Sequence, residues 1–540
     1  MPKLSPVCFL TAALLAGWCS AATYYVSPGG SDGNPGDLAR PFKTLAKAGS
    51  VANVGDTFFF RAGTYTGTLQ LSRSGTAASP ITFKNYPGEQ PIFDAQVTDY
   101  KAVGYNIGPL YVNYVVFEGL ELTNASENIL LWGGHHRTIR NCVIHTAQLN
   151  CVQFHNGAHD DLIENCRIYD WNLKGLAIPA SEWSENYGIH CIQNGTNYTQ
   201  AITIRNNEIF MATPTPSVMA AASRWAGMMI ENAHATVIAN RIHDIQDAAI
   251  CIWRPVENLD YTVTDNVLYN MQGYAIAMDI NGRATRSLNV SRNLMHDVVT
   301  GDPNRWDINA LRIRGAISGG LCANNLVFSL RSGHHGIRLD SGDNNSKSVN
   351  IQLLNNTVIG GDNAFSIVQG STGIMLSCNI AKGVLKDVDI SADSGVTSNK
   401  NLLCGPGSTV KPQFVNAAAY DYRLCPTSPA IDAAAAVSTA LKDLAGNDPY
   451  DVPTVANTGT GPVTYRDIGC YEYVPGTILP GDANGDGAVD VGDLGILGAN
   501  YGKTTGMTWA SGDFTGNGAV DVGDLGILGA NYGRTQSMAQ

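Results

Sequence analysis

The heptapeptide IRNNEIF, residues 204–210, carries the pattern on which the fold depends. Close variants of it return along the chain as IRNCVIH, IENCRIYD, VIANRIHD, VTDNVLYN and VSRNLMHD. Each has an asparagine or a cysteine followed by apolar residues that alternate with variable ones, which is the pattern of a β-strand with one buried face. The sequence therefore predicts one short strand that is repeated many times.

Alignment on the repeated asparagine gives a column that returns at intervals of 22 to 33 residues. Its members are Asn207, Asn240, Asn266, Asn293, Asn325, Asn356, Asn379 and Asn401, with Cys142 and Cys166 in the equivalent place earlier. Two residues after each position stands a first apolar column, formed by Ile144, Ile168, Ile209, Ile242, Leu268, Met295, Val327 and Val358. A second apolar column, one strand further along each repeat, contains Phe154, Ile192, Ile230, Ile252, Met278, Ile313, Leu339 and Ile367.

A repeat of two or three short strands cannot bury its own inner face, so it must stack on its neighbours. The predicted fold is therefore all-β, a parallel β-helix (solenoid). An inward-facing asparagine can bond the backbone at a corner and the asparagine of the next coil, which satisfies buried polar groups. Cys142 and Cys166 should stack about 4.8 Å apart. They could form a disulfide or remain two buried free thiols, and the sequence does not decide between these alternatives.

The composition agrees with a turn-rich β protein, because charged residues make up 15% of the chain and glycine 58 of its 540 residues. The net charge of −12 argues against general binding to nucleic acids or membrane surfaces. Ten cysteines remain after residue 22, and none has the CxxC spacing of a zinc site.

Residues 1–22 have the parts of a secretory signal peptide. Lys3 lies in the basic region, an apolar run extends from Val7 to Trp18, and small residues at 20–22 suit cleavage. The apolar run is too short to span a bilayer, and no other segment is predicted to be transmembrane. We therefore expect a secreted, extracellular protein.

Three segments precede the repeats: YYVSPGGSDGNPGDLARPFKTLAKA, GDTFFFRAGTYTGTL and SPITFKNYPGEQPIFDA. With the asparagine column, they resemble secreted right-handed parallel β-helix proteins of the pectate-lyase-like superfamily over residues 23–403. The stretch from DYRLCPTSPAIDAA to DIGCYEY (421–473) resembles the closing module of many bacterial surface and secreted β-helices. We divide this part into an N-terminal cap with the first coils (23–100), a β-helix with a predicted substrate cleft (101–403) and a closing module (404–473).

After a predicted linker at 474–480, two further repeats follow: GDANGDGAVDVGDLGILGANYG (481–502) and GDFTGNGAVDVGDLGILGANYG (512–533). Oxygen-bearing side chains occupy positions 1, 3, 5, 9 and 12 of a calcium loop, with glycine at position 6 for the sharp turn. The predicted ligands are Asp482, Asn484, Asp486, Asp490, Asp493, Asp513, Thr515, Asn517, Asp521 and Asp524, with the carbonyls of Ala488 and Ala519 at position 7.

Aspartate at position 12 and the short helix DLGILGANYG make residues 481–533 resemble a dockerin, a small α-helical calcium-binding domain. The resemblance implies two Ca²⁺ ions and, as the partner, a cohesin module or a cell-surface scaffold. Val491, Gly492, Val522 and Gly523 stand where the family usually has a polar pair. Because the apolar core of this domain is small, metal ligation should fold it.

We expect the functional site beside those coils in which the connection between the two apolar columns is longer than in the others. The step is ten residues for 144–154, 242–252 and 268–278, but 24 for 168–192, 21 for 209–230 and 18 for 295–313. All three insertions leave from one corner, so they should form a wall beside a strand face, where a cleft is expected. The tryptophans of this region are Trp171, Trp183, Trp225 and Trp306 in the insertions and Trp253 on the adjoining strand. Their rings can stack on sugars or pin the loops by burial.

Residues that flank the second apolar column should point outward. Those just after it are His155, Gln193, Glu231, Trp253, Asp279, Arg314 and Asp340, and those just before it include Arg312 and Arg338. Glu231 and Asp279 should lie two coils apart, about 9 to 10 Å, near the upper end of the carboxylate spacing of inverting glycosidases. Between Gly175 and Ser346 the chain has twelve arginines and no lysine. Arginine in place of lysine suits recognition of the carboxylates of uronic acids. The alternative is that these arginines form outward salt bridges to Asp279 and Asp340.

Three histidines, His145, His243 and His296, share one position after the asparagine column, and an aspartate follows two of them. Tyr169, Phe210, Tyr269 and Phe328 occupy the same position in other coils. We therefore predict a stacked aromatic spine there in preference to a catalytic His–Asp pair.

The sequence predicts a carbohydrate-active enzyme that cleaves glycosidic bonds in a polysaccharide that contains uronic acids, such as pectin. In β-elimination, calcium or an arginine neutralises the uronate and Arg312 or Arg338 removes the neighbouring proton. The resemblance allows a further catalytic Ca²⁺. Asp160 and Asp161 are an adjacent acidic pair, but the motif that surrounds such a site in the family is missing, so no catalytic residue is assigned from the resemblance.

In hydrolysis, Glu231 and Asp279 act instead as the acid and the base. The predicted substrate-binding residues are His155, Trp183, Trp225, Trp253, Trp306, Arg314 and Asp340. A non-catalytic glycan-binding adhesin is the second function class, and an epimerase is a more distant alternative.

Overall fold

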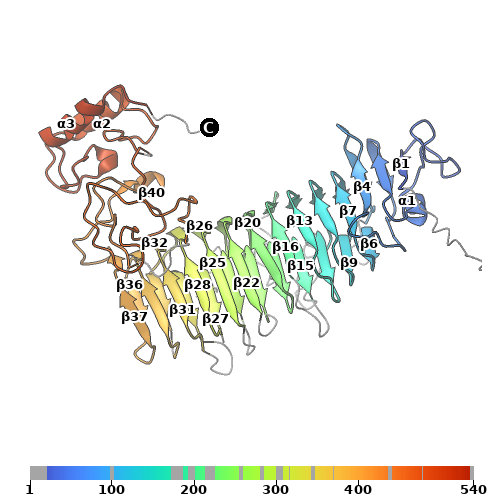
Figure 1. Ribbon diagram of the computed structural model, residues 1–540, viewed down its shortest axis with the longest axis horizontal. Helices are drawn as coiled ribbons and strands as arrows, with labels where there is room; N and C mark the ends of the chain where they lie inside the picture. Colours follow the sequence, from blue (N-terminus) through green and yellow to red (C-terminus); the bar gives the residue numbers. More distant parts are fainter. Residues whose placement is uncertain are drawn as a thin grey trace, which may run out of the picture.

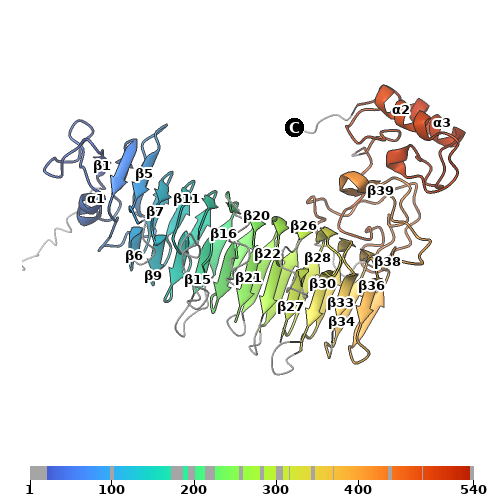
Figure 2. The same ribbon diagram turned by 180° about the vertical axis from the view of Figure 1, so that it is seen from behind.

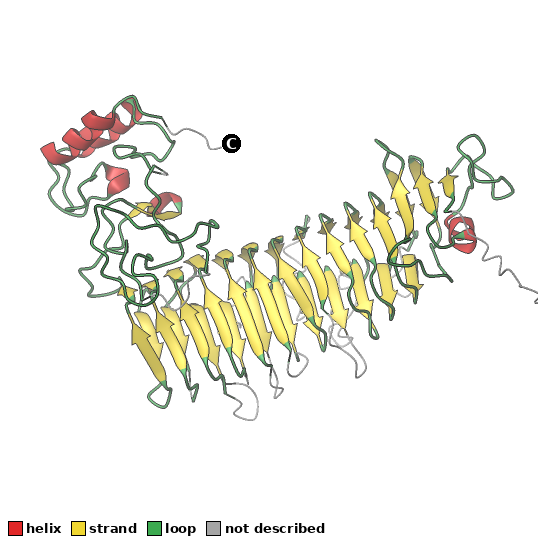
Figure 3. Ribbon diagram, viewed as in Figure 1, coloured by secondary structure: helices red, strands yellow, loops and turns green. Residues whose placement is uncertain are grey.

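A computed structural model of the protein forms an elongated solenoid that is followed by a compact C-terminal region (Figure 1). The structure describes residues 21–97, 103–171, 186–192, 201–212, 226–254, 259–279, 285–298, 308–315, 317–341, 347–368, 370–435, 441–476 and 478–535. In these residues three parallel sheets run along the solenoid, with 14 strands in sheet A, 13 in sheet B and 11 in sheet C (Figure 3). The predicted all-β fold, a right-handed parallel β-helix, is confirmed.

Sheet A contains β1 (Thr23–Val26), β2 (Thr57–Phe60), β4 (Ile81–Asn85), β7 (Val115–Glu118), β10 (Thr138–Arg140), β13 (Leu162–Glu164), β16 (Ile202–Arg205), β19 (Ala235–Ile238), β22 (Asp260–Thr264), β25 (Ser287–Ser291), β28 (Gly320–Ala323), β31 (Ile351–Leu354), β34 (Ile374–Ser377) and β37 (Val396–Asn399). Sheet B contains β3 (Gly63–Thr66), β5 (Pro91–Asp94), β8 (Glu121–Thr123), β11 (Val143–His145), β14 (Arg167–Tyr169), β17 (Glu208–Phe210), β20 (Arg241–Ile245), β23 (Val267–Met271), β26 (Leu294–Val298), β29 (Leu326–Leu330), β32 (Thr357–Ile359), β35 (Ile380–Lys382) and β38 (Leu402–Leu403).

Sheet C contains β6 (Tyr105–Leu110), β9 (Glu127–Trp132), β12 (Val152–His155), β15 (Ile189–Ile192), β18 (Met228–Glu231), β21 (Ile250–Trp253), β24 (Ile276–Asp279), β27 (Asn309–Arg314), β30 (His335–Asp340), β33 (Asn363–Ile367) and β36 (Lys386–Ile390). Outside the solenoid sheets lie α1 (Leu45–Val51), the antiparallel pair β39 (Phe414–Asn416) and β40 (Asp421–Leu424), the 3₁₀ turns η3 (Ala417–Ala419) and η4 (Trp509–Ser511), and the helices α2 (Val491–Asn500) and α3 (Val522–Asn531). Helix α1 packs the buried Leu45 and Ala48 against the N-terminal end of the solenoid core.

The asparagine column forms a continuous hydrogen-bonded ladder at the corner between sheets A and B. In a typical rung, Nδ2 and the backbone N–H of Asn240 both donate to Oδ1 of Asn266, at 3.1 and 2.9 Å. Nδ2 of Asn240 also donates to the carbonyl of Ile204 in the preceding coil, at 3.0 Å. The residue before each asparagine takes the left-handed conformation that makes the bend, as at Asn206 (φ 55°) and Asp265 (φ 62°). The predicted role of the repeated asparagine is thus confirmed.

Sheet pairing tests both predicted apolar columns. The first column, from Ile144 to Val358, is paired residue by residue as predicted. In the second column one member is wrong, because Cys191 and not Ile192 pairs with Phe154 and Ile230. Ile192 pairs with Glu231 and points outward, so Ile192 also takes the outward place that was predicted for Gln193, which lies outside the described residues.

The remaining column predictions concern the cysteines and the aromatic residues. Cys142 and Cys166 are buried free thiols, so of the two alternatives the structure has the unpaired one. The predicted aromatic spine is confirmed: ring centroids 4.7 to 5.3 Å apart connect His145, Tyr169, Phe210, His243, Tyr269, His296 and Phe328 on sheet B. His243 and His296 also contact the following aspartates at 2.7 Å, so both features coexist.

The closing module (404–473) covers the A–B corner of the last coils. Nδ2 of Asn355 donates to the carbonyl of Asp467 at 2.7 Å, and the N–H of Cys470 donates to Thr357 at 3.0 Å. The ring of Tyr420 continues the aromatic spine beyond Phe328, with centroids 5.0 Å apart. These contacts lie on sheet B and its corner, and sheet C runs along another side of the solenoid (Figure 2).

The C-terminal region 478–535 packs on this closing module through a shared apolar core. That core joins Val415 and Cys425 of the closing module to residues such as Trp509, Phe514 and Leu528. Ile478 and Leu479, within the predicted linker, are buried in the same core. A further link is the hydrogen bond from Nε2 of Gln413 to the carbonyl of Gly516, at 3.2 Å.

Removal of one ladder amide should destabilise the solenoid. In Asn266→Ala, the N–H groups of Asn240 lose their shared acceptor inside the core, and we expect a loss of about 1 to 3 kcal/mol for each orphaned group. Urea unfolding followed by circular dichroism measures this change. Asn399→Ala, on an exposed position of β37, is the matched control, and equal stability of the two variants would contradict the role of the ladder.

The closing module should become less stable as the pH rises. Burial raises the pKa of Glu472 to about 7, and burial together with Glu472 raises the pKa of Asp467. A folded state with raised carboxyl pKa values holds protons that the unfolded chain releases, so stability falls as the pH rises from about 4.5 through about 7. The unfolding temperature, measured by calorimetry, should therefore be higher at about pH 5.5 than at about pH 8, and Glu472→Gln should reduce the difference. An unchanged pH dependence in that variant would reject this account.

Candidate functional site

The outer face of sheet C carries two parallel columns of side chains. Pairing of the strands places Trp132, His155, Ile192, Glu231, Trp253, Asp279, Arg314 and Asp340 in the first column. The second column contains Gln153, His190, Met229, Cys251, Ala277, Arg312 and Arg338. The structure therefore gathers on one face all the predicted catalytic residues, together with His155, Trp253, Arg314 and Asp340.

Each of the three long connections leads into a strand of this face. The three predicted insertions run from β14 to β15, from β17 to β18 and from β26 to β27, so all of them cross from sheet B to sheet C. Trp183, Trp225 and Trp306 lie outside the described residues. Trp171 is fully buried in the solenoid core, so of the two alternatives for this tryptophan the structure has burial and not exposure to a sugar.

One end of the face is a network of arginines and aspartates. Arg314 Nη1 lies 2.8 Å from Asp279 Oδ2, and Arg312 Nη2 lies 2.9 Å from Asp340 Oδ2. Arg338 Nε lies 3.5 Å from the same oxygen of Asp340. The outward salt bridges that the sequence left as an alternative are thus present. Three guanidinium groups gather at this end of the face, and a guanidinium matches the geometry of a carboxylate, so the cluster suits an anionic ligand.

The other end of the face carries Glu231 and two histidines. Nε2 of His190 lies 3.8 Å from Oε2 of Glu231, and both side chains are largely buried. His155 stacks on Trp132, with ring centroids 4.1 Å apart. Burial and the neighbouring His190 lower the pKa of His155, so this imidazole stays neutral at physiological pH.

His190 and Trp132 are absent from the predicted set of site residues. His190 precedes the second apolar column, where only Arg312 and Arg338 were considered, and Trp132 lies one coil before the first aligned repeat. A search for aromatic or titratable residues in both flanking columns could have found them.

Between the two ends lies an apolar floor. Met229, Cys251 and Ala277 form the middle of the second column, and Trp253 and Tyr274 pack beside them. Arg254 lies over the ring of Trp253 at 4.5 Å, and Nη1 of Arg312 donates to the hydroxyl of Tyr274 at 3.1 Å. A sugar ring placed on this floor would have Glu231 on one side and the arginines on the other. The face can therefore bind an acidic sugar and exchange a proton with it.

Asp160 and Asp161, the adjacent acidic pair of the sequence, both contact basic side chains. Asp161 is fully buried in an ion pair with Arg137, at 2.6 Å, and Asp160 contacts the ring of His159 at 3.0 Å. Across the described residues, no three His, Cys, Asp or Glu side chains are grouped closely enough to hold a metal ion. A catalytic Ca²⁺ stays a prediction without assigned ligands on this face.

The two C-terminal loops have several features that fit calcium. Oδ2 of Asp482 accepts the N–H of Gly487 at 2.9 Å, and the same bond in the second loop joins Asp513 and Gly518 at 2.7 Å. Both glycines adopt the positive φ that the sharp turn requires, 85° and 83°. Burial, followed by the effect of neighbouring carboxylates, raises the pKa of both Asp482 and Asp513. A bound cation would offset that cost, so the residues suit calcium, although they accept backbone N–H groups here.

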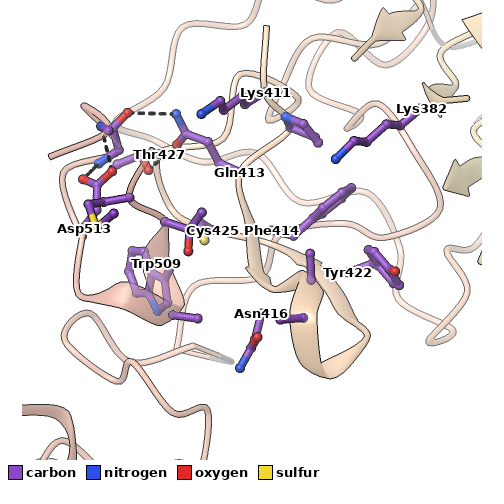
Figure 4. Close-up of a pocket in the computed structure, with 18 of the residues that line it drawn as sticks. Lys382, Lys411, Gln413, Phe414, Asn416, Tyr422, Cys425, Thr427, Trp509 and Asp513 are labelled. Atoms are coloured by element: carbon purple, nitrogen blue, oxygen red, sulfur yellow. Dashed lines mark hydrogen bonds between the residues drawn. The ribbon is translucent and has the colours of Figure 1, made fainter. Parts of the chain in front are cut away.

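The junction between the closing module and the C-terminal region encloses a cavity of about 380 Å³. Figure 4 shows Phe414, Tyr422 and Trp509 around it, with Lys382 and Lys411 at one side. Asp513 and Gly516 of the second loop also line it. The cavity is therefore part of the contact between the two modules and is separate from the sheet C face.

Comparison with family models finds two matches within the solenoid. The model described as "Pel9A-like, right handed beta helix region" matches residues 24–207. The model described as "right handed beta helix region" matches residues 127–302. None of the helices that the structure describes has the length and apolar character needed to cross a lipid bilayer.

Among curated proteins, the chain is similar to pectate lyase PEL9 of Emericella nidulans, with 41% identity over 78 residues, 14% of this chain and 19% of that protein. It is also similar to pectate lyase L of Dickeya chrysanthemi, with 28% identity over 166 residues, 29% of this chain and 39% of that protein. The chain thus spans less than half the length of these relatives. Among solved structures, pectate lyase Pel9A aligns with 15% identity and a TM-score of 0.42, over 85% of this chain and 98% of that one.

Calcium should bind the C-terminal loops and stabilise this region. We expect isothermal titration calorimetry to find two sites, and Asp482→Ala and Asp513→Ala each to remove one of them. When free calcium exceeds the dissociation constant about 100-fold, each site should add about 2.7 kcal/mol of stability. Asp448→Ala, at an exposed position outside the loops, is the control. Two remaining sites in either loop variant would rule out this ligand assignment.

Proposed function

We propose that this protein is a secreted carbohydrate-active enzyme that cleaves glycosidic bonds in a polysaccharide that contains uronic acids. The observation that carries the proposal is the sheet C face, which aligns Glu231, Trp253, Asp279 and the arginine cluster on one rigid surface. The partial similarity to pectate lyases supports the same substrate class. Extracellular action is consistent with the signal-like sequence at 1–22.

The first candidate reaction is β-elimination. The arginine cluster of Arg312, Arg314 and Arg338 would bind the uronate carboxylate and make the adjacent C–H more acidic. A base on the face then removes that proton while the glycosidic oxygen leaves. Arg312 and Arg338 were the sequence-based choice of base, but in the structure both contact Asp340, which suits binding better than proton removal.

Hydrolysis is the second candidate reaction, and the separation of the carboxylates favours it. Glu231 and Asp279 lie two strands apart in one column, about 9 to 10 Å, which leaves room for a water molecule. Asp279, which contacts Arg314, would act as the base, and Glu231 would be the acid. A glycan-binding adhesin remains the non-enzymatic alternative, in which the same face binds without cleavage.

The C-terminal region has a separate proposed role. We infer that residues 481–533 bind calcium and attach the enzyme to a protein partner, a cohesin-like module or a cell-surface scaffold. The support is the duplicated loop sequence and the exposed apolar residues on both helices, Val491 at 71% and Val522 at 73% exposure.

A panel of glycans distinguishes the candidate reactions. The purified full chain is incubated with pectic and other acidic polysaccharides, and absorbance near 235 nm and reducing ends are recorded together. Unsaturated products would indicate elimination, reducing ends alone would indicate hydrolysis, and binding without either product would support the adhesin. Neither cleavage nor binding across the panel would overturn the proposed function.

Substitution of either carboxylate on the face should reduce turnover strongly. We expect Glu231→Gln and Asp279→Asn to lower kcat by about 10²- to 10⁴-fold, because each removes a proton-transferring or charge-stabilising group. Steady-state kinetics on the best substrate measures the effect. Glu164→Gln removes an outward carboxylate of sheet A that pairs with Arg205 at 2.7 Å, and this control should keep wild-type activity. Normal rates in the two sheet C variants would exclude this face as the active site.

A further inference from the structure

His190 occupies an unusual position on the outer side of sheet C. It points away from the solenoid core, yet only 6% of the residue is exposed. Gln153 and Met229 flank it in its column, and the ring of Tyr187 meets it edge-on with centroids 4.8 Å apart. Within the described residues, neither ring nitrogen has a hydrogen-bond partner. A buried polar ring of this kind costs free energy unless a nearby charge compensates it.

Glu231 supplies that charge from the next coil. The 3.8 Å between Nε2 of His190 and Oε2 of Glu231 exceeds a hydrogen bond, but a small side-chain rotation or one bridging water would connect the two groups. Among the described residues, the other titratable groups that face His190 are His155 and Tyr187. Burial and His190 lower the pKa of His155, and His190 is the described imidazole that contacts Glu231.

The partner distinguishes Glu231 from the other carboxylates of the face. Asp279 and Asp340 pair with arginines, and a guanidinium keeps its proton at all physiological pH values. An imidazole gains and loses its proton near neutral pH. Glu231 is therefore paired with a side chain that can return a proton to it or take one from it.

We propose that Glu231 transfers the proton in glycosidic cleavage and that His190 is its positioning residue, which orients the carboxylate and exchanges the proton with it between turnovers. This inference rests on the proposed function and assigns roles within the same face. Trp253, on the far side of Glu231 in the column, then provides the surface on which the sugar lies beside that carboxylate.

The proton balance is complete for either reaction. In hydrolysis, the Glu231 carboxyl group gives its proton to the glycosidic oxygen as the C–O bond breaks. Water supplies the hydroxyl group of the new reducing end and gives its other proton to Asp279, which releases it to solvent. His190 then reprotonates Glu231 and regains a proton from water. In elimination, the Glu231 carboxylate takes the proton beside the uronate carboxylate, the electron pair forms the C=C bond, and the leaving oxygen takes a proton from water. The proton on Glu231 passes through His190 to solvent.

Kinetics of His190→Gln tests this role. We expect kcat to fall about 10- to 100-fold while KM changes less than about twofold, because His190 acts on proton transfer and does not touch the sugar. The kcat–pH profile should also shift, because the side chain that exchanges a proton with Glu231 is gone. His243→Gln is the matched control, since His243 is buried and contacts Asp244 at 2.7 Å on sheet B. Its profile should be unchanged.

A second measurement is independent of activity. In full-length protein with ¹³C-labelled histidine, the ring signal of His190 is assigned by its loss in His190→Gln. Its titration should change in Glu231→Gln and stay the same in Asp279→Asn. If wild-type protein cleaves no glycan, the proposed function fails, but this comparison still decides whether the pair is coupled. An unchanged titration in Glu231→Gln, or an unshifted pH profile in a folded His190→Gln variant, would overturn the inference.

Discussion

The shared acceptor of the asparagine ladder is the interaction on which the rest of the structure depends. Each Oδ1 receives both the backbone N–H and the side-chain amide of the neighbouring coil, as between Asn293 and Asn325. Two bonds to one oxygen fix the coils relative to each other to within a single residue. In a strand with one buried face, a slip of one residue would turn every side chain over. The ladder at one corner therefore determines which residues reach the outer face of sheet C, on another side of the coil.

This fixed register holds the arginines and aspartates of the face on neighbouring strands, so that their opposite charges lie close together in one arrangement. The aspartates orient the guanidinium groups before a ligand arrives, which lowers the cost of ordering long side chains on binding. Under the proposed function, a uronate would have to compete with Asp279 and Asp340 for the arginines. In that proposal the arginine cluster would select for acidic sugars, whereas the apolar floor around Trp253 would not distinguish one sugar ring from another.

The sequence predicted the solenoid and most of the face because strand alternation with a fixed marker residue is a local signal. It failed at IHCI, residues 189–192, where apolar side chains stand at both inner and outer positions. Only pairing with Phe154 and Ile230 shows that Cys191 is the inner residue. A local pattern could not predict the contact of His190 with Glu231 or the burial of Trp171 either, because both depend on residues of other coils. Spacing alone could not decide whether Asp279 was free or paired.

The C-terminal repeats show how equal sequences acquire unequal surroundings. Residues 487–502 and 518–533 are identical, and the helices expose equivalent side chains, with Tyr501 and Tyr532 both at 52%. The loops differ, because a side chain on Gly485 would meet nothing within 4 Å, whereas one on Gly516 would lie 2.6 Å from Gln413 and 2.8 Å from Thr427. The second loop is therefore held against the closing module, and the first is not. Duplication leaves the exposed faces of the two helices alike, while docking on the closing module makes the two loops physically distinct.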